Sequence, residues 1–168
     1  MNNRVTILIC GKASSGKTTF ATVLAQEINK LAEDKARVIH NAQTVKTIAE
    51  ACFSWDKEKD AKGRQLLLDI TSAGYNYDPF HWEKETELMF RRYKSVYEDL
   101  EILIIPDWRY KSTYDFFSKY GRVIPVHIER FNQQDGTHSN HSSENDFKKF
   151  PKKFKTFNEI RRIYLYRS

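Results

Sequence analysis

The chain has 168 residues, of which 40% are hydrophobic and 14% aromatic, which is enough apolar material for one folded core and argues against disorder. Its formal net charge of +6 belongs to the last segment: residues 147–168 hold eight Lys or Arg and one acidic residue, whereas residues 1–146 hold 20 basic and 21 acidic residues. No apolar run approaches the roughly 20 residues that span a bilayer, and the N-terminus lacks a signal-peptide core. We therefore expect one cytoplasmic domain over residues 1–146, followed by a basic tail over residues 147–168.

Strands and helices alternate in the first part of the chain. Residues 4–10 predict a buried strand, residues 17–31 carry apolar side chains at helical spacing, and residues 36–40 predict a second strand. The two cysteines, Cys10 and Cys52, match no disulfide or metal-site spacing, so we expect both to be packing residues.

A mostly helical stretch follows over residues 45–97. Gly, Asn, Asp and Pro predict breaks at residues 54–56 and 74–79. Alternating acidic and basic residues over 82–97 indicate a solvated helix, and we expect its inward-facing side chains to be Leu88, Met89 and Tyr93.

The remaining elements complete the pattern of a parallel sheet. Residues 102–105 are continuously apolar, as in a central strand. Residues 111–120 predict a helix that Gly121 ends, and residues 123–128 predict a fourth strand. Strands that alternate with helices indicate an α/β fold with helices on both faces of the sheet, and ligands of such sheets bind at the carboxyl ends of the strands.

The loop between the first strand and the first helix carries the clearest chemistry. Residues 11–18 match GxxxxGK[ST], the P-loop, in the strand-to-helix context that the motif requires. Backbone N–H groups of such a loop wrap a phosphate, and the following helix N-terminus attracts the same anion. The alternative is a flexible turn, which the flanking elements disfavour. We expect ATP to be bound by Gly11, Ala13, Ser14, Ser15, Gly16, Lys17, Thr18 and Thr19.

Three charged residues in and after the P-loop, Lys17, Asp107 and Arg109, have expected catalytic roles. Lys17 would act on the β and γ phosphates, and the Thr18 hydroxyl would ligate Mg²⁺. Asp107 follows the third strand, where a carboxylate can hold the Mg²⁺ shell, and Arg109 comes two residues later. A structural ion pair between Asp107 and Arg109 is the alternative, and the two roles are compatible.

Four stretches together resemble the phage-type deoxynucleoside monophosphate kinases, which are distant relatives of adenylate kinase. The likeness runs from about residue 5 to residue 144. It rests on the P-loop, on Trp55-Asp56-x-x-x-Asp60-x-x-Gly63-Arg64-x-Leu66-Leu67 with Asp78-Pro79-x-x-Trp82, on Asp107-Trp108-Arg109-Tyr110, and on His141-Ser142-Ser143-Glu144.

This resemblance implies a P-loop three-layer α/β/α fold with a central parallel sheet. It also implies a helical acceptor-binding insertion over about residues 42–98 and a short lid loop over about residues 130–145. The implied reaction transfers the γ-phosphoryl group of ATP, with Mg²⁺, to a deoxynucleoside monophosphate. Implied acceptor-binding residues are Lys46, Arg64, Trp82, Arg109, His141 and Glu144, and Arg130 would supply transition-state charge from the lid.

Several of these assignments have a plain alternative. Lys46 and Arg64 are also what exposed helix positions ordinarily carry. The aromatic residues Tyr75, Tyr77 and Trp82 can stack on a base, although core packing is commoner. The spacing of His138, His141 and Glu144 admits zinc, but a mobile lid suits this Gly, Asn and Ser-rich loop better.

The chain departs from the family pattern in two places. No arginine lies near Tyr75 or Asn76, where a monophosphate clamp is expected, and a basic stretch replaces the fifth apolar strand. Thr156 and Glu159 in that stretch form a capping-box pattern that predicts a short helix.

Two rival functions remain. One is phosphorylation of another small phosphorylated acceptor, such as phosphomevalonate. The other is a nucleotide-dependent module whose basic, phenylalanine-rich tail contacts nucleic acid, although a solvated tail is the preferred interpretation. We expect a small-molecule partner, no nucleic acid and no membrane, and the sequence leaves a homodimer open.

Overall fold

The computed structural model describes residues 4–128. Its elements in chain order are β1 (Val5–Cys10), α1 (Lys17–Leu31), β2 (Ala36–Val38), α2 (Gln43–Phe53), α3 (Ala61–Tyr77), α4 (His81–Lys94), β3 (Ile102–Ile105), α5 (Lys111–Phe117) and β4 (Arg122–His127). The predicted roles of Arg130, His141 and Glu144, the lid over 130–145 and the tail over 147–168 concern residues outside this range.

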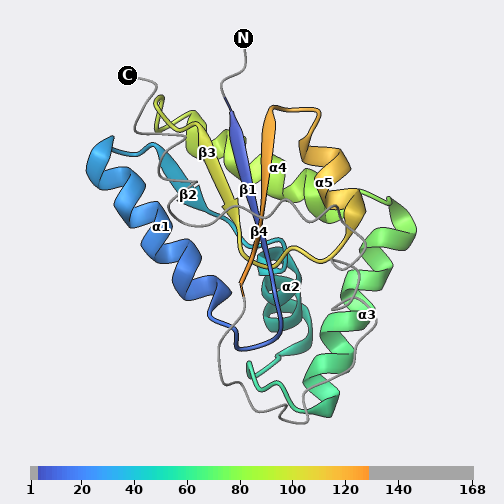
Figure 1. Cartoon of the computed structure of the whole chain (residues 1–168). Coiled ribbons are helices and arrows are strands. Elements are labelled where there is room, and N and C mark those ends of the chain that lie inside the picture. The colour runs from blue at the N-terminus through green and yellow to red at the C-terminus, as the bar shows by residue number, and fades with distance from the viewer. Residues whose placement is uncertain (1–3, 129–168) are drawn as a thin grey trace.

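The four strands form one parallel sheet in the order β2-β3-β1-β4. Val5 of β1 lies opposite Ile102 of β3 and Arg122 of β4, so the strands start in register. Helix α1 covers one face of the sheet, and helices α4 and α5 cover the other (Figure 1). This is the expected three-layer α/β/α arrangement with a central parallel sheet.

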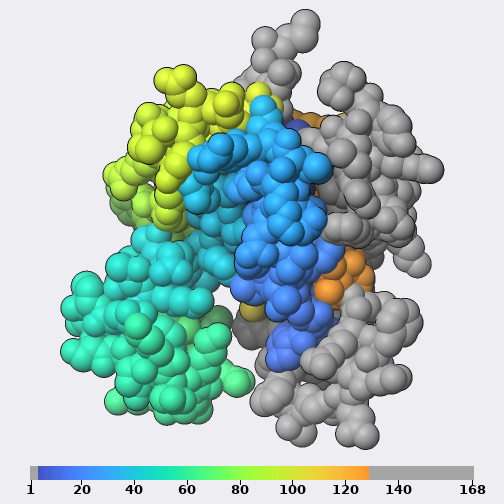
Figure 2. Space-filling view, turned by 90° about the vertical axis from the view of Figure 1, so that its left-hand side faces the viewer, coloured from blue at the N-terminus to red at the C-terminus, as the bar shows by residue number. Residues whose placement is uncertain are grey.

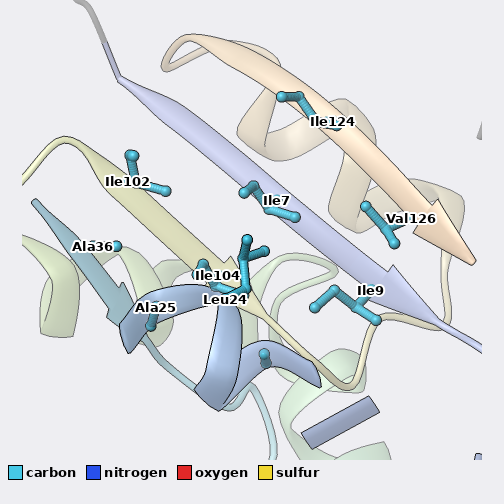
Figure 3. Close-up of a cluster of buried hydrophobic side chains, with 10 residues drawn as sticks. Ile7, Ile9, Leu24, Ala25, Ala36, Ile102, Ile104, Ile124 and Val126 are labelled. Carbon is cyan, nitrogen blue, oxygen red and sulfur yellow. The ribbon is translucent and has the colours of Figure 1, made fainter. Parts of the chain in front are cut away.

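Each face of the sheet has its own apolar core. Because side chains alternate along a strand, Ile7 and Ile9 of β1 pack with Leu24 and Ala25 of α1 (Figure 3). Leu8 and Cys10 pack on the opposite face with aromatic residues of α4 and α5. All four residues of β3 are buried, which explains its continuous apolar run.

The predicted break over residues 74–79 is wrong at Gly74, because α3 continues to Tyr77. A Cβ atom at Gly74 would lie 2.5 Å from atoms of the Trp82 ring. The glycine therefore allows α3 and α4 to approach closely, instead of ending a helix. The other break is longer than predicted, since α2 ends at Phe53 and α3 begins at Ala61.

The predicted inward face of the helix after Pro79 is confirmed only for Met89, which is partly buried against the core. It is wrong for Leu88 and Tyr93, which are each 42% exposed. The buried positions of α4 include three polar ones, and together they are Trp82, Glu83, Thr86, Glu87 and Phe90. These polar groups are paired with residues distant in sequence: Thr86 donates to Asn41 Oδ1 at 2.7 Å, and Glu87 forms an ion pair with Arg4 at 2.5 Å.

Two further findings concern expected properties of the chain. Cys10 is buried as expected, but Cys52 is exposed, so it is not a packing residue. Among residues 4–128 no helix is both long and apolar enough to cross a membrane.

Candidate active site

The P-loop joins β1 to α1 at the carboxyl edge of the sheet. Gly11 has φ +146°, and a Cβ atom there would lie 2.3 Å from the Ile128 carbonyl oxygen, so only glycine lets the loop pass this close to the end of β4. Gly16 has φ +93° and forms the N-cap of α1. Ser14 also has a positive φ, +60°. The chain thus turns back sharply before the helix begins.

Lys17 lies over this loop. Its Nζ donates to the carbonyl oxygen of Gly11 at 2.8 Å and to that of Lys12 at 2.5 Å. The ammonium group is therefore held across the mouth of the loop by backbone acceptors. The positive charge of Lys17 is therefore positioned before any phosphate binds in the loop.

Three observations show that the loop suits a phosphate group. No side chain caps α1, so the first backbone N–H groups of the helix are left for another acceptor. Within residues 4–128, apart from its chain neighbours and the backbone of its own helix, no atom lies within 4 Å of a Cβ built on Gly16, so the space beside this residue is open. Ser15 is buried, and its Oγ has no hydrogen-bond partner among the described residues. Together they fit the expected contacts of Gly11 and residues 13–19 with the phosphates of ATP.

The residues present also fit a magnesium ion held chiefly by phosphate oxygens. Thr18 is exposed in the first turn of α1, and Asp107 follows β3 at the same edge of the sheet. Residues 4–128 contain no group of three or more His, Cys, Asp or Glu side chains that could hold a metal by themselves. Mg²⁺ commonly takes one or two protein ligands and completes its shell with phosphate and water.

Asp107 has a structural role that the sequence did not predict. Its Oδ1 accepts the backbone N–H of Asn41 at 3.1 Å, and its Oδ2 accepts that of Ala42 at 3.0 Å. These amides immediately precede α2. The carboxylate therefore ties the start of α2 to the end of β3, and a carboxylate oxygen can still take a further ligand on its second lone pair.

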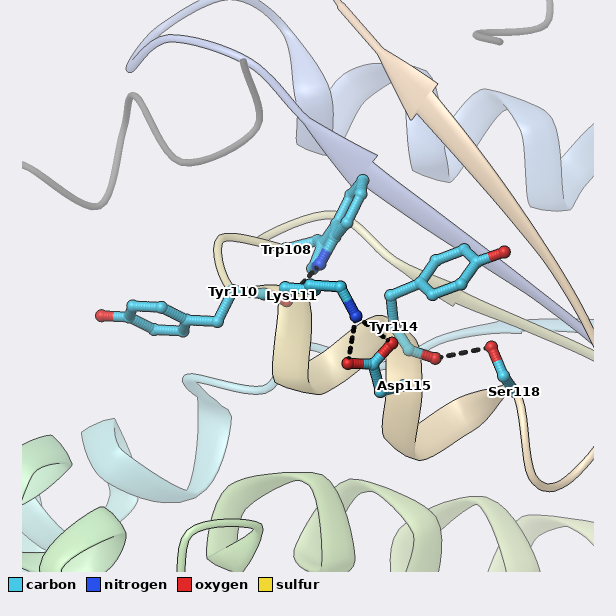
Figure 4. A network of polar contacts seen from close by, with 6 residues as sticks. All are labelled: Trp108, Tyr110, Lys111, Tyr114, Asp115 and Ser118. Atoms are coloured by element: carbon cyan, nitrogen blue, oxygen red, sulfur yellow. Dashed lines mark hydrogen bonds and ion pairs between the residues drawn. The ribbon is translucent and has the colours of Figure 1, made fainter. Parts of the chain in front are cut away.

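The loop after Asp107 is fixed by its tryptophan. Trp108 is 3% exposed; its backbone N–H donates to the Ile9 carbonyl oxygen at 3.1 Å, and its Nε1 donates to the Tyr110 carbonyl oxygen at 2.7 Å. Figure 4 shows the Tyr110 side chain pointing away from that of Trp108 and from helix α5. Arg109, between them, is exposed.

Residues 55–64, which carry part of the family resemblance, build the turn between α2 and α3. Trp55 Nε1 donates to the Glu58 carbonyl oxygen at 2.8 Å, and Asp60 caps α3 by accepting the Gly63 N–H at 2.6 Å. Arg64 is exposed, and its Nε donates to the Lys59 carbonyl oxygen at 2.7 Å. Arg64 lies in the first turn of α3, and its contact with the acceptor phosphate stays a prediction.

The other predicted acceptor-binding residues in the described range lie on α2 and α4. Lys46 is half-buried in the first turn of α2, whose start Asp107 holds. Trp82 is 3% exposed, and its Nε1 donates to the Thr71 carbonyl oxygen at 2.9 Å. Its ring packs against Gly74. Trp82 therefore matches the core-packing alternative and not the stacking of a base.

A polar cluster near Asp107 was missed by the sequence analysis. Glu83 is fully buried, and its Oε1 accepts the hydroxyl of Thr113 at 2.6 Å and that of Tyr75 at 3.2 Å. The Tyr75 ring meets the ring of Tyr110 edge-on, with centroids 5.7 Å apart. Burial, followed by the charge of Glu83, raises the pKa of Tyr75, so the phenol stays protonated and remains a donor. The only sequence signal for this cluster is the acidic residue Glu83 at a position of α4 that lies on its buried side.

Cys10 ends β1 directly before the P-loop. Burial raises the pKa of its thiol to about 12, and the nearby charge of Lys17 opposes the shift only in part. The group is therefore a neutral thiol at physiological pH and takes no part as a nucleophile.

The P-loop and the α2–α3 region border a hollow on the molecular surface. Figure 2 shows it between the dark blue start of α1 and the cyan-to-green residues of α2 and α3. The P-loop thus faces the helical region of α2 and α3 across an open space.

Comparisons with known proteins give a partial match to one curated protein. No protein-family model matches the chain. Over 99 residues it is 30% identical to tRNA dimethylallyltransferase 1 of Parabacteroides distasonis; the match covers 56% of this chain, which spans only 28% of that protein's length.

Solved structures give weaker matches. The hexameric APS kinase of Thiobacillus denitrificans is 15% identical, with a TM-score of 0.36 and coverage of 74% of this chain and 22% of that chain. The APS kinase of Mycobacterium tuberculosis is 13% identical, with a TM-score of 0.38 and coverage of 77% of this chain and 81% of that chain. These TM-scores are too low to carry an argument, so the P-loop fold rests on the sheet and loop geometry described above.

Proposed function

We propose that this protein is an ATP-dependent phosphotransferase that moves the γ-phosphoryl group onto a deoxynucleoside monophosphate. The observation that carries the proposal is the P-loop, with Lys17 held over it, an open front at Gly16 and the unpartnered Ser15 hydroxyl. The acceptor assignment rests on the family resemblance and on the helical region across the hollow (Figure 2).

In this proposal the P-loop residues bind and orient ATP. Backbone N–H groups of the loop and of the first turn of α1 hold the β and γ phosphates, and Lys17 stabilises the charge that gathers on them as the γ-phosphoryl group leaves. When bound, Mg²⁺ would supply positive charge that stabilises the phosphate oxygens. In this proposal Thr18 and Asp107 would complete its coordination shell.

The acceptor end requires positive charge, because two polyanions must approach each other. Lys46 lies on α2 and Arg64 on α3, the two helices that border the hollow (Figure 2), and Arg109 follows Asp107 in the loop after β3. A bidentate arginine contact would hold a monophosphate in line with the γ phosphate. Asp107 contributes indirectly, since its bonds to Asn41 and Ala42 fix the start of the helix that carries Lys46.

A second candidate function is transfer of a dimethylallyl group to tRNA. The partial match to a tRNA dimethylallyltransferase favours it. In that reaction the P-loop would bind the diphosphate of an allylic donor. The basic residues over 147–168 would suit a nucleic acid.

ADP release tests the proposal. The purified protein is mixed with ATP, Mg²⁺ and each nucleoside monophosphate in turn, and phosphomevalonate extends the panel. We expect one or more deoxynucleoside monophosphates to support turnover, and Lys17→Ala to abolish it while far-UV circular dichroism stays unchanged. Lys12→Ala removes a charge from the same loop without touching the GK pair and serves as the control.

The outcomes separate the candidates. ADP release with phosphomevalonate alone would move the acceptor to another class of phosphorylated molecule. Diphosphate release from dimethylallyl diphosphate in the presence of tRNA, without ADP release from any acceptor, would favour the second candidate. Turnover by Lys17→Ala at the wild-type rate would refute the phosphate-site assignment itself.

A further inference from the structure

Helix α3 is held in place by few buried contacts. Over its described length, residues 61–77, Gly63 is its one buried residue, although the helix carries the expected acceptor-binding residue Arg64 in its first turn. Near the other end of the helix the ring of Tyr75 meets the ring of Tyr110, with centroids 5.7 Å apart and planes at 81°. Since Tyr110 lies in the loop after β3, this contact joins the proposed acceptor region to the edge of the sheet.

Polar contacts close a circuit around this pair of rings. The Tyr75 hydroxyl donates to Glu83 Oε1 at 3.2 Å, and the Thr113 hydroxyl donates to the same oxygen at 2.6 Å. The backbone N–H of Thr113 donates in turn to the carbonyl oxygen of Tyr110 at 3.2 Å. Buried hydrogen-bond networks of this kind rigidify the groups that they connect. The Tyr75 ring and the backbone of Tyr110 are therefore held in one fixed arrangement.

The loop that carries Arg109 is anchored on both sides of this residue. Trp108 is 3% exposed, and its Nε1 donates to the carbonyl oxygen of Tyr110 at 2.7 Å. The Tyr110 side chain points away from Trp108 and from α5 (Figure 4), and its ring is only partly buried. Arg109 itself is exposed. Its backbone direction, and hence the direction in which its side chain extends, depends on both anchored neighbours.

We propose that Tyr110 is a positioning residue whose ring, set against Tyr75 of α3, holds Arg109 in the orientation that meets the acceptor phosphate. This inference rests on the proposed function and assigns no substrate contact to Tyr110 itself. The loop after β3 is then attached to both acceptor helices, to α2 through Asp107 and to α3 through Tyr110. A two-pronged arginine contact depends on such orientation, because two N–H groups must meet the phosphate oxygens together.

Tyr110→Leu tests the ring contact, because leucine keeps apolar bulk but has no ring. The contact of two aromatic rings corresponds to about 2- to 10-fold in an equilibrium constant. We expect the acceptor KM to rise by that factor and the ATP KM to stay unchanged, since the P-loop lies outside the circuit. Tyr110→Phe keeps the ring and should rescue the acceptor KM. Tyr93→Leu is the matched control: it makes the same change on α4, where the ring packs on Arg37, and should change neither KM.

Combination with Arg109→Lys shows whether Tyr110 acts through Arg109. Lysine cannot form the two-pronged contact, so the orientation of this position should matter less in that background. We expect Tyr110→Leu to raise the acceptor KM when Arg109 is present and to add nothing further in Arg109→Lys. An equal rise in both backgrounds would overturn the proposal. A wild-type acceptor KM in Tyr110→Leu would overturn it as well, as would a parallel rise of both KM values, which a general loss of structure produces.

Hydrogen exchange measures the link between α3 and the loop without any acceptor. Tyr75→Leu removes the same ring contact from the α3 side, and it replaces Tyr110→Leu if that variant does not fold. We expect the amides of Trp108 and Thr113 to exchange about 2- to 10-fold faster than in the wild-type protein. Unchanged exchange over residues 107–113 in a folded Tyr75→Leu variant would overturn the proposal. Faster exchange without ADP release from any acceptor would refute the proposed function and support the link itself.

Discussion

Replacement of Asp107 separates its structural role from its role toward the metal. Each carboxylate oxygen accepts one backbone N–H, from Asn41 at 3.1 Å and from Ala42 at 3.0 Å. A hydrogen bond to a charged group contributes about 1.5–3 kcal/mol to stability. Because the group is only half-buried, we expect Asp107→Ala to lower the free energy of unfolding by roughly 2–4 kcal/mol.

Asp107→Asn should lower the free energy of unfolding by about half as much as Asp107→Ala. The asparagine carbonyl oxygen can accept one of the two amides, whereas its NH₂ group faces the other N–H, donor against donor. Released from β3, the start of α2 should shift, and the acceptor KM should rise with it. If Asp107 only bound Mg²⁺, its replacement would instead lower kcat, and extra Mg²⁺ would restore part of the lost kcat.

Urea unfolding in EDTA isolates the structural part, because no divalent metal is then present. Asp115→Asn is the matched control: it removes an exposed carboxylate that pairs with Lys111 on α5, and such a pair contributes only about 0.3–0.5 kcal/mol. If both Asp107 variants have the wild-type free energy of unfolding in EDTA, the stabilising link between β3 and α2 is refuted. A stability loss accompanied by kinetics that Mg²⁺ partly rescues would show that the residue serves both purposes.

The three remaining predictions concern Gly74, the two cysteines and Arg109. Gly74→Ala should destabilise the fold by about 1–3 kcal/mol through overpacking against Trp82, although alanine favours helices by about 1 kcal/mol; urea unfolding that shows a gain would mean that the contact is loose. Cys52 should react with iodoacetamide at pH 8 while buried Cys10, with its pKa near 12, resists until urea is added; mass spectrometry that finds native Cys10 modified would contradict its burial. Arg109→Lys should raise the acceptor KM and leave ATP binding unchanged, because lysine keeps the charge but loses the bidentate fork; weakened ATP binding in calorimetry would move Arg109 to the nucleotide.

Local sequence patterns predicted the sheet and the loop that joins β1 to α1. The helix over residues 17–31 and the strand over residues 102–105 have the expected bounds, since hydrophobic periodicity in a contiguous segment reports directly on burial. The residues of the P-loop are also contiguous, so a local sequence motif is enough to predict the loop. Gly74 shows the limit of such reasoning, because a glycine ends a helix or admits a neighbouring ring depending on Trp82, which is eight residues away.

The buried polar contacts of α4 could not be predicted in this way, because they join segments that are distant in the sequence. Thr86 reaches Asn41 across 45 positions, Glu83 meets Thr113 across 30, and Arg4 meets Glu87 across 83. Each partner offsets the energetic cost of burying a polar residue, but the two meet only after the fold has formed. A helix whose apolar residues point to solvent while its carboxylates are buried is a local conflict, and such conflicts concentrate where function requires them. That conflict on α4 is resolved only by the tertiary structure, which brings Asn41, Thr113 and Arg4 to the polar side chains of the helix.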